Sequence, residues 1–262
     1  YMNGIKEFAE DSSGNAGASM SAYAANIGMK AHIFTPNSTP ENKKNQIKIF
    51  GSELHLIDGP RENSTIEVKK FTELTGINYL SHNYNPFFIE GMKSFGHEVF
   101  NEFHADITDI IIPVGNGSLL IGAVKAYEEL IKLKKISKMP KMHCIQVEGF
   151  SPIVKKFNSS EWKFNEFSKT LAGGIAVSNP PRLNQVIESI RNSNGKAIEV
   201  SEANILNWHK ELASWGFLSE ITCAAALAGT EKLIESGVIN EKSNIVIPIT
   251  GSGLKDLDKV NF

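Results

Sequence analysis

Short apolar runs, many of them β-branched, alternate along this chain with longer stretches of mixed polarity. The short runs predict strands, and several are apolar at consecutive positions, as in strands buried on both faces. They cover residues 31–34, 53–57, 77–80, 109–114, 143–147 and 245–249. The longer stretches predict helices at 16–27, 40–50, 86–103, 119–133, 181–191, 202–215 and 223–236. Such alternation predicts an α/β fold whose mostly parallel sheet is covered by helices.

Ligands of such sheets bind at the carboxyl ends of the strands, so the turns after the apolar runs are the candidate sites. The first turn contains Ser12, Ser13, Gly14 and Asn15, between the short apolar stretch 5–9 and an alanine-rich helix. Backbone N–H groups at a helix N-terminus bind anions, and the Asn15 amide can both donate and accept hydrogen bonds. Serine and asparagine are also the preferred helix caps, so a plain cap is the alternative interpretation.

The second turn, VGNGSLLIG, follows the apolar run that ends at Val114. Gly115 and Gly117 let a ligand approach the backbone closely, which is the outline of a phosphate cradle. A dinucleotide-binding turn would have glycine where Leu120 stands, although Glu148 lies near the expected carboxylate, so a dehydrogenase stays a weak alternative. The lysine of a Walker loop is missing. A glycine-rich turn without any ligand also stays possible.

The third turn, PITGSGLKD, follows the last apolar run. Thr250 and Ser252 offer neutral hydroxyls there, and Gly251 and Gly253 keep the backbone open. The local pattern does not separate a binding turn from an ordinary loop.

Composition removes several classes of protein. The 27 Lys and Arg residues nearly balance the 29 Asp and Glu residues, and a net charge of −2 argues against a nucleic-acid-binding protein. No apolar run approaches the ~20 residues that span a bilayer. Two cysteines, Cys144 and Cys223, cannot form a disulfide framework, which favours a reducing, cytoplasmic location. No two histidines have the spacing of metal ligands along a helix, so no metal site is expected, and His82 is expected to be a capping or surface residue.

Six stretches resemble, in family order, the fold-type II pyridoxal-phosphate enzymes, and within them the threonine synthase group. They are SSGNAG at 12–17, NPFFIEGMKSFGHEVF at 85–100, VGNGSLLIG at 114–122, AGGIAVSNPPR at 172–182, GFLSEITCAAALAG at 216–229 and PITGSGLKD at 248–256. One departure is Ile221, which stands where the group usually has proline. Cysteine synthases, cysteate synthases and hydroxy-amino-acid dehydratases share much of this layout.

The resemblance implies a role for each candidate residue. Pyridoxal 5'-phosphate would be the cofactor, and its phosphate would be held by Gly115, Asn116, Gly117, Ser118 and Leu119. Asn15 would bond the phenolic oxygen of the cofactor, and Thr250 would face its pyridine nitrogen. The substrate carboxylate would be received by Ser12, Ser13, Gly14 and Ala16.

The resemblance also implies the architecture and the reaction. A smaller mobile lobe would cover residues 12–93 and a larger lobe 94–262, with residues 1–11 left over from the preceding unit. The protein would be a homodimeric lyase that converts O-phosphohomoserine and water to L-threonine and phosphate. The alternatives are a related β-replacement or elimination enzyme, such as a cysteate or cysteine synthase or a threonine dehydratase, or a non-catalytic protein that binds a ligand with the same fold.

The lysine that forms the Schiff base is not found in its family context. In the family it lies upstream of the asparagine loop, and here only eleven residues precede Ser12. Lys6 is the one lysine among them, and it lacks the Lys-Asp-Arg context. We expect that the sequence is part of a longer chain with the lysine upstream of Tyr1; the alternative is a natural relative without it.

Overall fold

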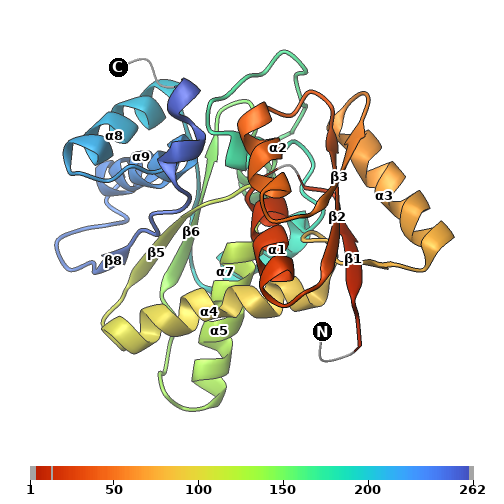
Figure 1. Cartoon of the computed structure of the whole chain (residues 1–262). Helices are drawn as coiled ribbons and strands as arrows, with labels where there is room; N and C mark the ends of the chain where they lie inside the picture. The colour runs from red at the N-terminus through yellow and green to blue at the C-terminus, as the bar shows by residue number, and fades with distance from the viewer. Residues whose placement is uncertain (1–3, 13, 260–262) are drawn as a thin grey trace. The chain divides into compact units, whose positions relative to one another are not determined.

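A computed structural model describes residues 4–12 and 14–259 of the chain (Figure 1). It forms two compact units, the first ending at Asn85 and the second beginning at Pro86. The sequence placed this boundary at residues 93 and 94, in the middle of helix α4 (Pro86–Phe103). In the structure the whole of α4 belongs to the second unit, where Gly96 lies against Ala123 and Ala126 of another helix.

The first unit has a four-stranded parallel sheet in the order β3-β2-β1-β4. Its strands are β1 (Glu7–Glu10), β2 (Lys30–Pro36), β3 (Glu53–Ile57) and β4 (Asn78–Tyr79). Its helices are α1 (Asn15–Asn26), α2 (Glu41–Lys48) and α3 (Arg61–Thr75). Strand β1 pairs with both β2 and β4, so residues 7–10 form an inner strand of this unit, whereas the sequence assigned them to a preceding one.

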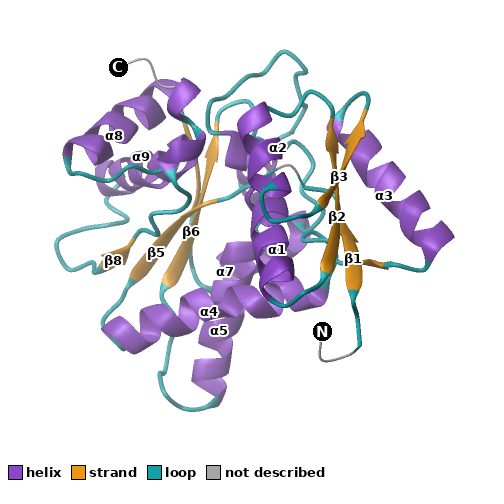
Figure 2. Cartoon of the chain, viewed as in Figure 1, coloured by secondary structure: helices purple, strands orange, loops and turns teal. Residues whose placement is uncertain are grey.

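The second unit has a second four-stranded parallel sheet, in the order β7-β6-β5-β8. Its strands are β5 (Asp109–Pro113), β6 (Lys141–Val147), β7 (Ala197–Val200) and β8 (Ile245–Val246). Besides α4, its helices are α5 (Ser118–Lys132), α6 (Pro152–Phe157), α7 (Leu183–Asn192), α8 (Glu202–Ser214) and α9 (Ile221–Glu235), with 3-10 turns η1 (Gly173–Ile175), η2 (Gly253–Lys255) and η3 (Leu257–Lys259). Figure 2 shows the sheets and their helices, and the predicted α/β class is confirmed.

The isoleucine run of β5 shows why this strand is apolar at every position. Ile110 and Ile112 pack with residues of α4, α5 and α7 in one core cluster, whereas Ile111 packs with residues of α8 and α9 in another. Successive side chains of a strand point to opposite faces, so a sheet covered on both faces needs apolar residues at all of them. The turn that leaves this strand is therefore held on a rigid, fully packed support.

The two cysteines are both buried and free. Cys144 is on β6 and Cys223 is on α9, and burial raises the pKa of both thiols. The expectation that Cys223 acts as a small buried apolar residue agrees with this.

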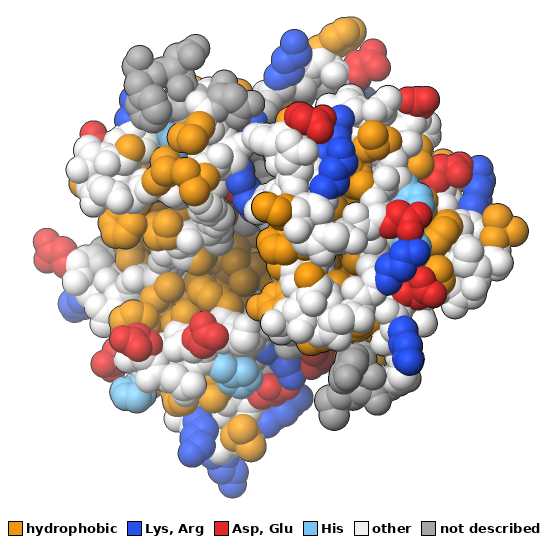
Figure 3. All heavy atoms as spheres, in the orientation of Figure 1, with side chains coloured by type: hydrophobic (Ala, Val, Ile, Leu, Met, Phe, Trp, Pro, Cys, Tyr) orange, Lys and Arg blue, Asp and Glu red, His pale blue; other side chains and the backbone are white. Residues whose placement is uncertain are grey.

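No helix in the described residues is long and apolar enough to cross a bilayer. In Figure 3 acidic and basic side chains are mixed over the visible face, as the small net charge suggests.

Candidate active site

The turn between β5 and α5 presents a row of free backbone donors. The N–H groups of residues 115–119 donate to no acceptor within the described chain, and no described side chain caps α5. Gly117, at the N-cap position, has φ +87°, in the left-handed region that favours glycine. Because the positive end of the helix dipole adds to these donors, the turn suits a phosphate group.

The glycines of this turn are required by what lies behind them. A Cβ on Gly115 would lie 2.8 Å from the carbonyl oxygen of Gly174 in η1. A Cβ on Gly117 would lie 2.1 Å from Cγ2 of Val186 in α7. The turn is thus packed directly onto the stretch 172–182 and the helix that follows it, which fixes the direction of its N–H groups.

Further contacts connect two more of the six stretches to this turn. The N–H of Gly174 donates to Oγ1 of Thr222, in the first turn of α9, at 3.0 Å. Glu220, just before α9, lies so close to Gly251 that a Cβ there would meet its carboxyl carbon at 2.5 Å. The stretches 114–122, 172–182, 216–229 and 248–256 therefore form one connected group in the second unit.

Thr250 lies at the edge of this group. The turn that follows it is tied to residues 218–220, because Gly251 accepts from the Glu220 N–H at 3.3 Å and Gly253 donates to Leu218 at 3.1 Å. Thr250 is partly buried beside the Cys223 thiol. Burial raises the pKa of that thiol, and hydrogen bonds with Thr250 and Ser219 offset part of the effect.

In the first unit, the asparagine loop connects β1 to α1. Ser12 is buried, and its hydroxyl accepts from the Gly14 N–H at 3.2 Å. Gly14 is the N-cap of α1, and no hydrogen bond from a described side chain caps this helix. Asn15 begins the helix and is exposed, and Ala16 is partly exposed. The remaining candidate, Ser13, lies outside the described residues.

A buried carboxyl group directly before this loop has no counterpart in the sequence predictions. Glu10 is fully buried at the end of β1, and it accepts from the backbone N–H of His82 at 3.1 Å and bonds the imidazole of the same residue. Burial raises the pKa of Glu10, and its bonds with His82 oppose the rise. His82 was expected to cap or to lie at the surface; its side chain is only 15% exposed and pairs with this carboxyl.

Asp11 extends the same arrangement. Its carboxylate accepts from Tyr79 at 2.6 Å, from Arg61 at 3.0 Å and from Thr65 at 2.5 Å, and Arg61 also bonds its carbonyl oxygen. Burial raises the pKa of Tyr79, and its bond to Asp11 adds to the rise. Arg61 and Thr65 come from α3, which the sequence did not predict. The network holds the chain at the residue before Ser12.

The sequences of known proteins agree with these observations. The family described as "Pyridoxal-phosphate dependent enzyme" matches residues 2–251. The threonine synthase of Methanocaldococcus jannaschii is 31% identical over 252 residues, 94% of this chain and 62% of its own length. The threonine synthase of Bacillus sp. (strain ULM1) is 32% identical over 94% of this chain and 68% of its own. The chain thus spans about two thirds of the length of these relatives.

Solved structures share the fold at lower identity. Maize serine racemase superposes with a TM-score of 0.85 at 21% identity, over 98% of this chain and 76% of that one. The processed threonine deaminase isoform 2 of Solanum lycopersicum gives a TM-score of 0.82 at 20% identity, over 98% and 71%. Since the family match covers nearly the whole sequence and the fold agrees, the chain belongs to the family of pyridoxal-phosphate dependent enzymes.

Proposed function

We propose that the protein is a lyase of the threonine synthase type, which converts O-phosphohomoserine and water to L-threonine and phosphate. The similarity to curated threonine synthases over 94% of the chain carries the choice of reaction. A homodimeric state and a cytoplasmic location belong to the same proposal.

The turn at 115–119 fits the phosphate of pyridoxal phosphate. Five free N–H groups at the start of a 15-residue helix offer donors and a favourable dipole, and the packed glycines leave the backbone open to the ligand. The bound cofactor supplies an electron sink for a carbanion next to the substrate amino group. In this proposal Ser118 adds its hydroxyl to the N–H donors, and Asn15 binds the phenolic oxygen of the ring.

The asparagine loop would receive the carboxylate of the substrate. Gly14 and Ala16 lie at the beginning of the 12-residue helix α1, where the helix dipole stabilises an anion. Ser12 and Ser13 would add hydroxyl donors. Asp11 takes part indirectly, since its bonds to Tyr79, Thr65 and Arg61 hold the backbone that leads into the loop. A loop held in one conformation binds substrate with a smaller entropy cost.

Thr250 offers the first specific test of the cofactor site. A neutral hydroxyl can donate a hydrogen bond to an unprotonated ring nitrogen but cannot hold a proton on it, which suits elimination over transamination. Thr250→Ala should lower turnover by roughly fivefold, the effect of losing one hydrogen bond of about 1 kcal/mol. Thr250→Ser keeps the donor and should retain most of the activity. Unchanged steady-state turnover in Thr250→Ala would contradict the assignment.

Product analysis tests the reaction itself. The intact protein, loaded with pyridoxal phosphate, should release phosphate from O-phosphohomoserine and form threonine in equal amounts. Formation of 2-oxobutanoate from threonine, or incorporation of sulfite or sulfide into an amino acid, would instead identify a dehydratase, a cysteate synthase or a cysteine synthase. Cofactor binding without turnover of any of these substrates would favour the non-catalytic alternative.

A further inference from the structure

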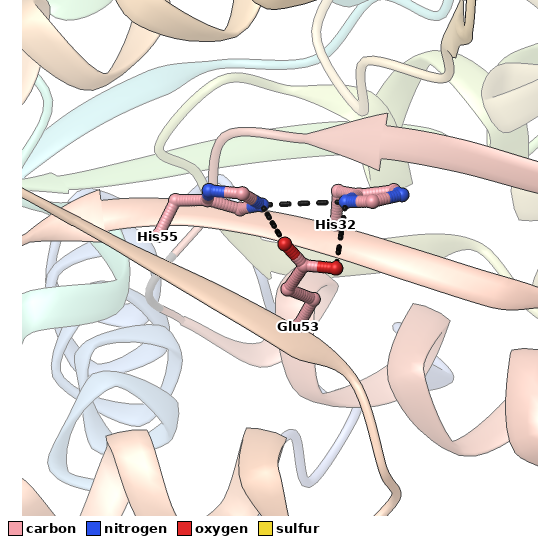
Figure 4. Close-up of side chains that lie close together, drawn as sticks. All are labelled: His32, Glu53 and His55. Carbon is pink, nitrogen blue, oxygen red and sulfur yellow. Dashed lines mark hydrogen bonds and ion pairs between the residues drawn. The ribbon is translucent and has the colours of Figure 1, made fainter.

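Two histidines and a glutamate, none of them assigned to the cofactor or the substrate, meet on one face of the first sheet. His32 is on β2, and Glu53 and His55 are on β3. The parallel register pairs His32 with Glu53 and Phe34 with His55, so these four side chains project to the same face. Figure 4 shows the three polar side chains pointing toward one another. We propose that His32, Glu53 and His55 form a binding site for a divalent transition metal ion, with Zn²⁺ the best fit.

Two imidazole nitrogens and the two carboxylate oxygens of Glu53 lie at distances that suit a tetrahedral ion, each nitrogen being close to a different oxygen. Nδ1 of His32 lies 3.3 Å from Nε2 of His55 and 3.5 Å from Oε2 of Glu53, and Nε2 of His55 lies 3.5 Å from Oε1 of Glu53. Zinc bonds of about 2.0–2.1 Å at tetrahedral angles place neighbouring ligand atoms roughly 3.3–3.4 Å apart. Two imidazoles and a carboxylate are also a ligand set that zinc accepts, with the fourth position left for water.

A second carboxylate orients the first of these histidines. Oε2 of Glu7, on β1, lies 3.2 Å from Nε2 of His32, the nitrogen that faces away from the cluster. When Nε2 of His32 carries the proton and donates a hydrogen bond to Glu7, the lone pair of Nδ1 faces His55 and Glu53. Metal-bound histidines commonly donate their other N–H to a carboxylate in this way, which fixes the tautomer and the ring orientation.

Aromatic neighbours restrain both imidazole rings. The ring of His55 stacks on Phe34 with centroids 4.2 Å apart, and Phe71 of α3 lies 4.9 Å from His32 and 5.4 Å from His55. His32 is buried, but the side chains of His55 and Glu53 are 23% and 48% exposed, so an ion can reach the site.

Lys30 competes for the same carboxylate. Its ammonium lies 2.9 Å from Oε2 of Glu53, and both side chains are about half exposed. An exposed ion pair of this kind contributes little to stability, so a divalent ion should displace it. Two glutamates, Glu7 and Glu53, against the single lysine Lys30 give the cluster a formal charge of −1, which favours a cation. In Figure 3 histidine, acidic and basic side chains gather at the surface of this part of the molecule.

Glu10, Asp11 and His82 also come close enough to hold a metal, but they are less suitable. Asp11 already accepts hydrogen bonds from Arg61, Thr65 and Tyr79, and Glu10 bonds His82 through both oxygens. An ion there would have to replace these bonds.

Calorimetric titration of the metal-stripped, cofactor-loaded protein with Zn²⁺ tests the site. One equivalent should bind, and His55→Ala or Glu53→Gln should weaken that binding by at least about 100-fold, since removing a ligand costs more than removing its supporting partner. Glu7→Gln should weaken it by about 10- to 100-fold. Lys30→Gln should bind Zn²⁺ at least as tightly as the natural protein. With Co²⁺ as the probe, the visible absorption of a tetrahedral complex should appear and be lost in His55→Ala.

His97→Gln is the matched control, since His97 also bonds a glutamate, Glu129 at 3.1 Å, but belongs to no metal-capable cluster in the described chain. It should bind Zn²⁺ normally. Each variant should show the circular dichroism and melting behaviour of a folded protein before titration. The proposal is overturned if the natural protein binds no Zn²⁺, if His55→Ala and Glu53→Gln bind it unchanged, or if His82→Ala removes the binding and His55→Ala does not.

Discussion

Alanine at position 117 is expected to reduce pyridoxal-phosphate affinity by more than tenfold. A residue with a side chain costs about 1–2 kcal/mol in the left-handed region, and Gly117 has φ +87°. The added Cβ would also lie 2.1 Å from Cγ2 of Val186, which is fully buried and cannot move freely. The turn must then shift, and every N–H group that faces the phosphate shifts with it. Fluorescence or absorbance titration of the apoprotein with the cofactor measures the effect.

Gly216→Ala is the control that separates the strain of a left-handed backbone from the loss of the phosphate-binding turn. Gly216 has the same φ of +87°, but a Cβ there would meet no described heavy atom within 4 Å. Both variants should therefore lose about 1–2 kcal/mol of stability from the backbone, and only Gly117→Ala should lose cofactor affinity. If the two variants bind pyridoxal phosphate equally well, the turn at 115–119 is not the phosphate site.

Replacing Asp11 by alanine should have the largest effect in the first unit. Asp11 is 1% exposed and accepts hydrogen bonds from Tyr79, Thr65 and Arg61. Removing one partner of a buried ion pair typically costs about 3–5 kcal/mol, and we expect roughly 2–3 kcal/mol here because the partly exposed Arg61 stays hydrated when Asp11 is gone. The same change frees the backbone before Ser12, so KM for the amino-acid substrate should rise well above its natural value. Denaturant unfolding and steady-state kinetics measure the two effects.

Asp58→Ala is the control for this variant. Asp58 lies in the same unit, but its bond to Asn37 at 3.2 Å is exposed, so its loss should change stability by no more than about 0.5 kcal/mol. Asp11→Asn retains one acceptor oxygen and should fall between the two. Equal unfolding free energies for Asp11→Ala and Asp58→Ala would show that the Asp11 network does not stabilise the loop.

The sequence predicted most clearly the strands that are buried on both faces. Strand β5 is apolar at consecutive positions because helices cover both of its faces, and that pattern is unambiguous. Helix α3 was missed because it buries little, with only Ser64 and Val68 fully buried among its 15 residues. Strand β7 was missed for a similar reason, since only its two end residues, Ala197 and Val200, are buried.

The candidate site was predictable where its function rests on backbone geometry. The sequence alone indicates this turn, because two glycines, Gly115 and Gly117, directly after an apolar strand are typical of a backbone that a ligand approaches closely. Glu10 and Asp11 gave no signal, since their partners His82, Tyr79 and Arg61 lie 50 or more residues away. The cluster of His32, Glu53 and His55 was missed because its members lie on two different strands, with His32 and His55 separated by 23 positions along the chain. A search for ligand spacing within one helix cannot find ligands that a strand register brings together.

The burial of both cysteines has a practical consequence for measuring motion in this protein. Cys144 and Cys223 are inaccessible, and their raised thiol pKa values leave almost no thiolate to react with a maleimide. Cysteines introduced at exposed positions should therefore be labelled selectively in an otherwise natural background. Leu74 of the first unit and Glu188 of the second are both exposed. A dye at either position would report structural change within its own unit as cofactor and substrate are added.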